Sequence, residues 1–163
     1  MLFWEKEGFV VNVKVNQLSE LSSQEFFEIA RERVKVFVVE QTCYYQEIDD
    51  GDATAYHLRL FDDQGYLVGY TRMMDEGTYA TFGRVLVPKA ERGHGYGRRL
   101  VQVTIEQTKQ LFPGKLIAIE AQNYLRDFYA SFGFKAVSDV FLLDGIPHVK
   151  MQLDGEGKNG NGN

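Results

Sequence analysis

A glycine-rich loop between a strand pattern and a helix pattern constrains the fold more than any other stretch. Residues 91–100 read ERGHGYGRRL, with glycine at every second position from 93 to 97. An alternating run at 79–87 precedes the loop and ends at Pro88, and helical spacing follows over 97–112. Because three alternating glycines cost backbone entropy, a plain turn explains them poorly. A strand, loop and helix in this order place backbone N–H groups and a helix dipole at one anion-binding spot.

Two familiar phosphate-binding patterns do not fit this loop. A dinucleotide fingerprint needs a third glycine where Arg98 stands, and a P-loop needs Gly-Lys-Ser/Thr, which is absent. The three arginines Arg92, Arg98 and Arg99 would raise the local positive potential. The loop therefore predicts a site for a pyrophosphate.

Alternating and helical patterns along the chain predict one α+β domain over residues 1–153. The predicted order β-α-β-β-β-α-β-α-β-β gives a mixed, mostly antiparallel sheet of about seven strands flanked by helices. A capping-box sequence at Ser22 and Glu25 opens the first helix. The polar tail 154–163 is expected to be disordered. The predicted strands are 9–15, 55–61, 66–74, 79–87, 115–121, 134–142 and 146–153, and the predicted helices are 23–39, 97–112 and 123–132.

Composition excludes several classes of protein. The net charge of -5 argues against nucleic-acid binding by the whole surface. One cysteine, Cys43, permits no internal disulfide. No apolar run approaches a membrane span, and the start MLFWEKEGF does not read as a signal peptide. No His, Cys or Asp cluster has metal-ligand spacing. We therefore expect a cytoplasmic protein without a metal, a membrane or a nucleic acid as partner.

Arg92-x-x-Gly95-x-Gly97 resembles the Q/R-x-x-G-x-G/A signature of the Gcn5-related N-acetyltransferases, the GNAT superfamily. The resemblance spans about residues 9–153 and implies the GNAT fold. Further stretches are similar to the ElaA-like branch of that superfamily. They are RVKVFVVEQ (33–41), GYTRM (69–73), FGRV (82–85), AQNYLRDFYASFGF (121–134) and DGIPHVKM (144–151).

The resemblance implies acetyl-CoA as co-substrate and assigns residues to it. The glycine loop would hold the pyrophosphate, and the strand before it would pair with pantetheine like an added β-strand. A backbone N–H near Leu86 would polarise the thioester carbonyl. Gln122 stands where many members carry an Asn, with Asn123 next to it. The implied residues are Val85, Leu86, Val87, Arg92, Gly93, His94, Gly95, Tyr96, Gly97, Arg98, Gln122 and Asn123.

The chemistry also needs an acid for the leaving thiolate and a base for the amine. Tyr129 matches the family's acid, although a tyrosine on an apolar helix face is more often packing. Glu40 and Glu120 rank first as bases. Glu47, His57 and His148 are further candidates, and the amine could instead lose its proton to water.

The run YYQEIDDGD at 44–52 has two readings. Its four acids could line an acceptor site for a cationic amine, or the run could be a solvated loop. The neighbouring Cys43 is expected to be a small buried apolar group rather than a nucleophile. Three arginines are either structural ion-pair formers or substrate anchors: Arg33, Arg72 and Arg84.

These residues together predict an acetyl-CoA-dependent N-acetyltransferase. It would transfer the acetyl group directly to a primary amine of a small molecule or peptide, and the family allows a homodimer. One alternative is a non-catalytic acyl-CoA-binding or sensing module, which would not need Tyr129. A second alternative is a nucleotide-binding protein that uses the same loop.

Overall fold

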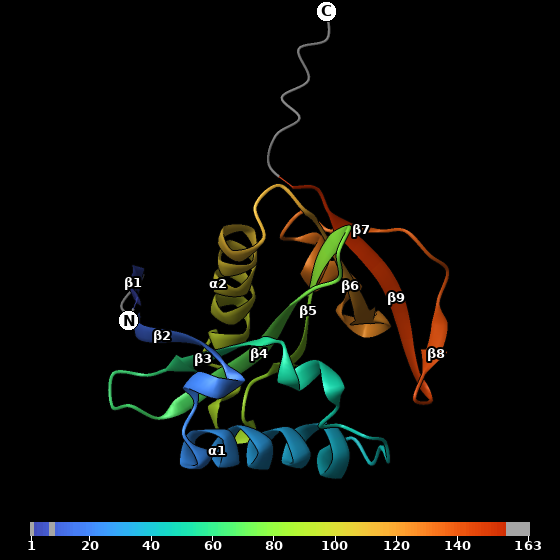
Figure 1. The fold of residues 1–163 in the computed structure, drawn as a ribbon. Coiled ribbons are helices and arrows are strands. Elements are labelled where there is room, and N and C mark those ends of the chain that lie inside the picture. The colour runs from blue at the N-terminus through green and yellow to red at the C-terminus, as the bar shows by residue number, and fades with distance from the viewer. Residues whose placement is uncertain (1, 7–8, 156–163) are drawn as a thin grey trace, which may run out of the picture.

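One mixed sheet runs through the molecule, with helices on both of its faces (Figure 1). The computed structural model describes residues 2–6 and 9–155. Within them the sheet has nine strands in the order β1-β2-β3-β4-β5-β6-β9-β7, and β8 pairs with β9. The α+β, mostly antiparallel architecture is confirmed. The strands are β1 (Leu2–Lys6), β2 (Phe9–Gln17), β3 (Tyr56–Phe61), β4 (Leu67–Asp75), β5 (Tyr79–Leu86), β6 (Leu116–Gln122), β7 (Lys135–Ala136), β8 (Phe141–Leu143) and β9 (Ile146–Leu153).

The parallel contact between β5 and β6 is short. These strands pair only at Tyr79 with Leu116 and at Ala80 with Ile117. Beyond this point β6 continues along β9 from Ile117 to Gln122, while β5 continues along β4. The two strands therefore diverge, and no strand in the described part of the chain pairs there with the edge of β5 that faces β6.

The helices divide the core between the two faces of the sheet. Helix α2 (Tyr96–Leu111) and helix α3 (Arg126–Ala130) cover one face, where Leu58 and Leu60 of β3 belong to the main core. Helix α1 (Ser23–Arg33) covers the other face, as shown by the hydrogen bond from Arg59 of β3 to Glu25 of α1. Alternate residues of β3 thus point to opposite helices.

The predicted helix at 23–39 changes its hydrogen bonding part-way. The capping box at Ser22 and Glu25 is formed, and α1 ends at Arg33. A π-helix follows at Val34–Glu40, and Gln41 N–H bonds to the Val36 carbonyl five residues back. Such wide turns often occur at functional sites.

Two strand predictions need correction. The sequence patterns did not predict β1, which pairs antiparallel with β2. In place of the predicted strand 134–142 there are two short strands, β7 and β8, and between them the Ser138 side chain accepts a hydrogen bond from the Lys150 N–H of β9. Most of the expected tail, from residue 156 onward, lies outside the described residues. No helix in the described part of the chain is long and apolar enough to cross a membrane.

Candidate active site

A cavity of about 1290 Å³ lies where β5 and β6 diverge. Residues of the glycine loop, α2 and α3 form one side. The other side is the open face of the sheet, which includes Thr81, Ala118 and Glu120. Nine residues predicted to hold acetyl-CoA line the cavity, whereas His94, Arg98 and Asn123 do not. The nine are Val85, Leu86, Val87, Arg92, Gly93, Gly95, Tyr96, Gly97 and Gln122.

A β-bulge distorts β5 at the wall of this cavity. Tyr70 of β4 lies opposite Leu86, but Arg72 lies opposite Gly83, so two residues of β5 face one residue of β4. Arg84 occupies the bulge with φ 51°, a left-handed conformation that costs a non-glycine residue about 1–2 kcal/mol. The bulge breaks the alternation of side chains: Phe82 belongs to the core under α2, and Leu86 belongs to the core under α1.

The glycine loop has the backbone that an anion site requires. Gly93 and Gly95 have φ values of 85° and 82°, and Gly95 is the N-cap of α2. The first N–H groups of a helix have no partner within the helix. A Cβ built on either glycine would meet no protein atom within 4 Å, so the space above the loop is open. The loop therefore fits a pyrophosphate group.

Replacing Gly95 by alanine should weaken the binding of CoA about tenfold, because alanine disfavours the left-handed conformation by about 1–2 kcal/mol. Calorimetric titration with CoA measures the effect. Gly65→Ala is the matched control, since Gly65 has φ 86° and an equally open Cβ position in the turn between β3 and β4. Equal CoA affinities for the two variants would contradict the assignment of the loop.

Two arginines of the loop contact protein groups. Arg92 binds both carboxylate oxygens of Glu40, and its Nε donates to the Val87 carbonyl at 3.0 Å. Arg98 donates to Ser131 Oγ at 3.1 Å and stacks over the Phe132 ring at 5.0 Å. The guanidinium groups therefore brace the loop against neighbouring elements.

Tyr129 reaches the cavity from α3. Its side chain is only 5% exposed and packs against Phe128 and Phe134, with ring centroids 5.3 and 6.0 Å apart. Burial raises the pKa of this phenol above its usual value. Tyr129 is therefore protonated at neutral pH, which is the state that can donate a proton.

The two favoured bases have different surroundings. Hydrogen bonds from Arg92 lower the pKa of Glu40, so its carboxylate is a weak base bound to a cation. Glu120 lies exposed on the open face of β6, opposite Lys150 of β9, and lines the cavity. The geometry favours Glu120 over Glu40 as a proton acceptor.

The two strand histidines are held by hydrogen bonds. His57 is fully buried, and its Nε2 donates to the Asp52 carbonyl at 3.0 Å. Its Nδ1 therefore accepts from the Tyr70 hydroxyl at 2.6 Å, and burial lowers the pKa of the ring. His148 lines the cavity, and its Nδ1 lies 2.7 Å from the Ile146 carbonyl. His57 is thus a neutral structural residue.

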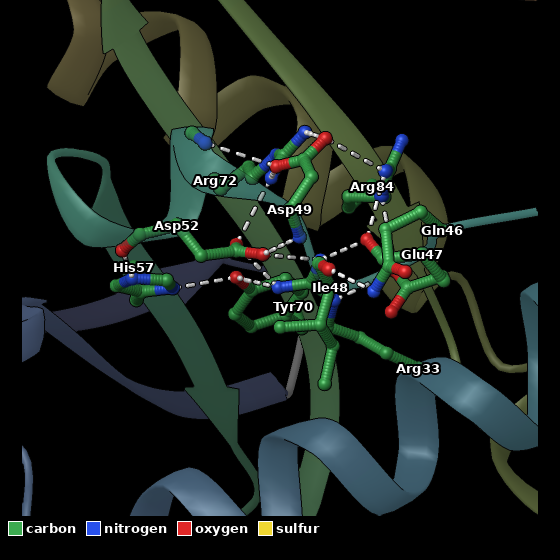
Figure 2. A network of polar contacts seen from close by, with 11 residues as sticks. Arg33, Gln46, Glu47, Ile48, Asp49, Asp52, His57, Tyr70, Arg72 and Arg84 are labelled. Atoms are coloured by element: carbon green, nitrogen blue, oxygen red, sulfur yellow. Dashed lines mark hydrogen bonds and ion pairs between the residues drawn. The ribbon is translucent and has the colours of Figure 1, made fainter.

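Three of the four acids in the run 44–52 bind arginines, as Figure 2 shows. The fourth, Asp50, is exposed. Glu47 and Asp52 are each 3% exposed, and both bind the fully buried Arg33, with shortest distances of 2.8 and 2.6 Å. Asp49 binds Arg72 of β4 through two hydrogen bonds of 2.6 and 3.1 Å. Arg33 and Arg72 are therefore ion-paired, and Arg72 also lines the cavity.

Arg84 of β5 is the third arginine of this network, 3.0 Å from a Glu47 carboxylate oxygen. Sequence reasoning did not pair these residues, because they come from four separate elements. Cys43, next to the acidic run 44–52, is buried as expected, and its Sγ donates to the Asp144 carbonyl.

The network should make folding sensitive to acid. Burial alone would raise the pKa of Asp52, but Arg33 outweighs it and lowers the pKa from 3.8 to about 2. Because the folded pKa is below the unfolded one, this stabilisation is present above about pH 4 and is lost as the pH falls toward 2. Urea unfolding between pH 6 and pH 3 should show a smaller loss of stability for Asp52→Asn than for the wild type. An identical loss would contradict this.

Residues 17–154 match the family described as acetyltransferase (GNAT) domain. The chain belongs to the GNAT family. Membership indicates an acyltransferase. In this GNAT protein the cavity lies between the diverging strands β5 and β6, beside the glycine loop at the start of α2.

Individual relatives place this GNAT protein in the ElaA-like branch. Protein ElaA of Escherichia coli K12 is 39% identical over 137 residues, which cover 82% of this chain and 90% of that protein. A UPF0039 protein of Schizosaccharomyces pombe is 42% identical over 138 residues, with coverages of 83% and 92%.

Two solved structures have the same GNAT fold. An acyl-CoA N-acyltransferase from Pseudomonas aeruginosa superposes with a TM-score of 0.81 at 33% identity, covering 87% of this chain and 98% of that chain. Escherichia coli ElaA gives 0.80 at 35% identity, with the same coverages.

Proposed function

We propose that this GNAT protein transfers the acetyl group of acetyl-CoA directly to a primary amine of a small molecule or peptide. The observation that carries the proposal is the divergence of β5 from β6 beside a left-handed bulge and a buried tyrosine at the cavity wall. The unpaired edge of β5 offers backbone groups to an extended ligand, as an added strand would use them. Acetyl-CoA would supply the thioester.

Each step has a candidate group in the cavity. The N–H groups of the first turn of α2 would bind the pyrophosphate. Backbone N–H groups near Leu86, at the bulge, would polarise the carbonyl, as in an oxyanion hole. As the nitrogen–carbon bond forms and the carbon–sulfur bond breaks, Tyr129 would protonate the leaving sulfur, and the amine would give its proton to Glu120 or water.

The two acids allow a direct comparison. We expect Glu120→Gln to lower kcat about 10²-fold, the size of a lost general base, and Glu40→Gln to change it by less than about threefold. Thiol release at saturating amine, followed from pH 6 to 9, measures both variants. A large loss in Glu40→Gln with none in Glu120→Gln would reverse the assignment.

The proposal is tested by screening a library of amines for release of free thiol from acetyl-CoA by the purified protein. Calorimetry with acetyl-CoA, ATP and NAD runs in parallel. Amine-dependent thiol release is the expected result. Tight binding of acetyl-CoA without release for any amine would favour the sensing module, and tight binding of ATP alone would overturn the proposal.

A further inference from the structure

We propose that the buried network fixes the β5 bulge, so that Glu47 and Asp49 are positioning residues for the N–H groups that polarise the thioester carbonyl. The inference rests on the proposed function. It gives a role to charged residues that the transfer chemistry itself does not use (Figure 2).

The network contacts both strands at the bulge and on either side of it. On β4, Tyr70 pairs with Leu86 and Arg72 pairs with Gly83. These two pairs lie on either side of the bulge. Arg33 donates to the Tyr70 hydroxyl at 3.3 Å, and Asp49 and Asp52 both lie within 3.0 Å of Arg72. The β4 side of the bulge is therefore held by charged groups from α1 and the 41–55 loop, of which Arg33 and Asp52 are buried.

On β5, the network holds the strained residue itself. Arg84 has a left-handed backbone although glycine, which adopts that conformation freely, occupies the preceding position 83. Its Nη2 donates to the Glu47 carbonyl at 2.9 Å and lies 3.4 Å from Asp49 Oδ2. The guanidinium also lies 5.3 Å from the centroid of the Tyr45 ring. The side chain at this position thus anchors the bulge to the loop.

Glu47 connects Arg84 to the most buried part of the network. One oxygen, Oε1, lies 2.8 Å from Arg33 Nε and 3.0 Å from Arg84 Nε. Within the described residues, the other oxygen is buried without a hydrogen-bond partner, which is unfavourable for stability. Since a buried ion pair is weak evidence for stability, this arrangement is better explained by the position it imposes on Arg84.

Three arginines and three carboxylates form the network, so the formal charges cancel. No further ion is needed to balance it. Arg84 also lines the cavity, so the network holds in place a residue of the cavity wall.

The test compares Glu47→Gln with Glu25→Gln, which removes a charge from an ion pair on the same face of the sheet, with Arg59. Three quantities are measured: kcat for thiol release, Kd for CoA, and hydrogen exchange of the segment 82–87. We expect Glu47→Gln to lower kcat about 10²-fold, the cost of a misplaced oxyanion donor. Its Kd for CoA should change by less than about threefold, and exchange at 82–87 should rise. Glu25→Gln should leave all three unchanged.

Arg84→Gly serves as a second variant if Glu47→Gln does not fold. It relieves the left-handed strain but removes the anchor. Faster exchange at 82–87 and a lower kcat are expected. Higher stability with unchanged exchange and unchanged kcat would overturn the inference.

The two proposals fail in different ways. Active wild-type protein with an equally active Glu47→Gln and unchanged exchange at 82–87 would overturn the positioning role alone. Wild-type protein that releases no thiol with any amine would overturn the proposed function. The positioning role would then fail with it, whatever the exchange at 82–87.

Discussion

Tyr129→Phe is expected to lower kcat for thiol release by about 10²-fold, within the range of a lost general acid. The phenol is buried at the cavity wall, and, like any phenol, it is protonated at neutral pH. Phenylalanine preserves the ring contacts with Phe128 and Phe134. The affinity for CoA and the thermal midpoint should therefore change little.

Steady-state kinetics with the best amine from the screen measures this effect, and calorimetry with CoA measures binding. Tyr56→Phe is the matched control, because Tyr56 packs against Phe112 at a centroid distance of 6.0 Å outside the cavity. Wild-type kcat in Tyr129→Phe would show that Tyr129 is a packing residue.

Arg33→Met should reduce the free energy of unfolding by about 3–5 kcal/mol, the cost of removing one partner from a buried ion pair. Arg33 is 0% exposed and binds Glu47, Asp52 and Tyr70. Methionine fills part of the volume but leaves two buried carboxylates with one arginine partner each, Glu47 with Arg84 and Asp52 with Arg72.

Urea unfolding at pH 7 measures the loss. Lys35→Met is the control on the neighbouring π-helix, since Lys35 forms a surface pair with Glu32 at 3.5 Å and should lose less than about 1 kcal/mol. Equal losses in the two variants would contradict the view that the network supports the fold.

Local patterns in the sequence predicted much of this structure. The glycine loop could be predicted from the sequence because Gly93 and Gly95 answer a local requirement, a left-handed backbone at their own positions. The sequence patterns placed β3, β4, β5, β6 and β9. Burial alternates along β6, whereas β3 and β4 are buried on both faces.

The partners of the charged residues could not be predicted from local sequence patterns. Whether Arg92 reaches a ligand or Glu40 depends on how a π-helix 52 residues away packs against the loop. The bulge at Arg84 also has no local signal, because the residue in the left-handed position is not glycine. Its cause lies in the network, which only the tertiary structure assembles.

The central claim is that the cavity between β5 and β6 transfers an acetyl group to an amine. The most direct measurement follows the two products of one reaction together, free thiol and N-acetylated amine, the latter by mass spectrometry. The account predicts that both form in equal amounts and that Tyr129→Phe slows both equally. Acetyl-CoA that binds tightly and remains intact with every amine would contradict it.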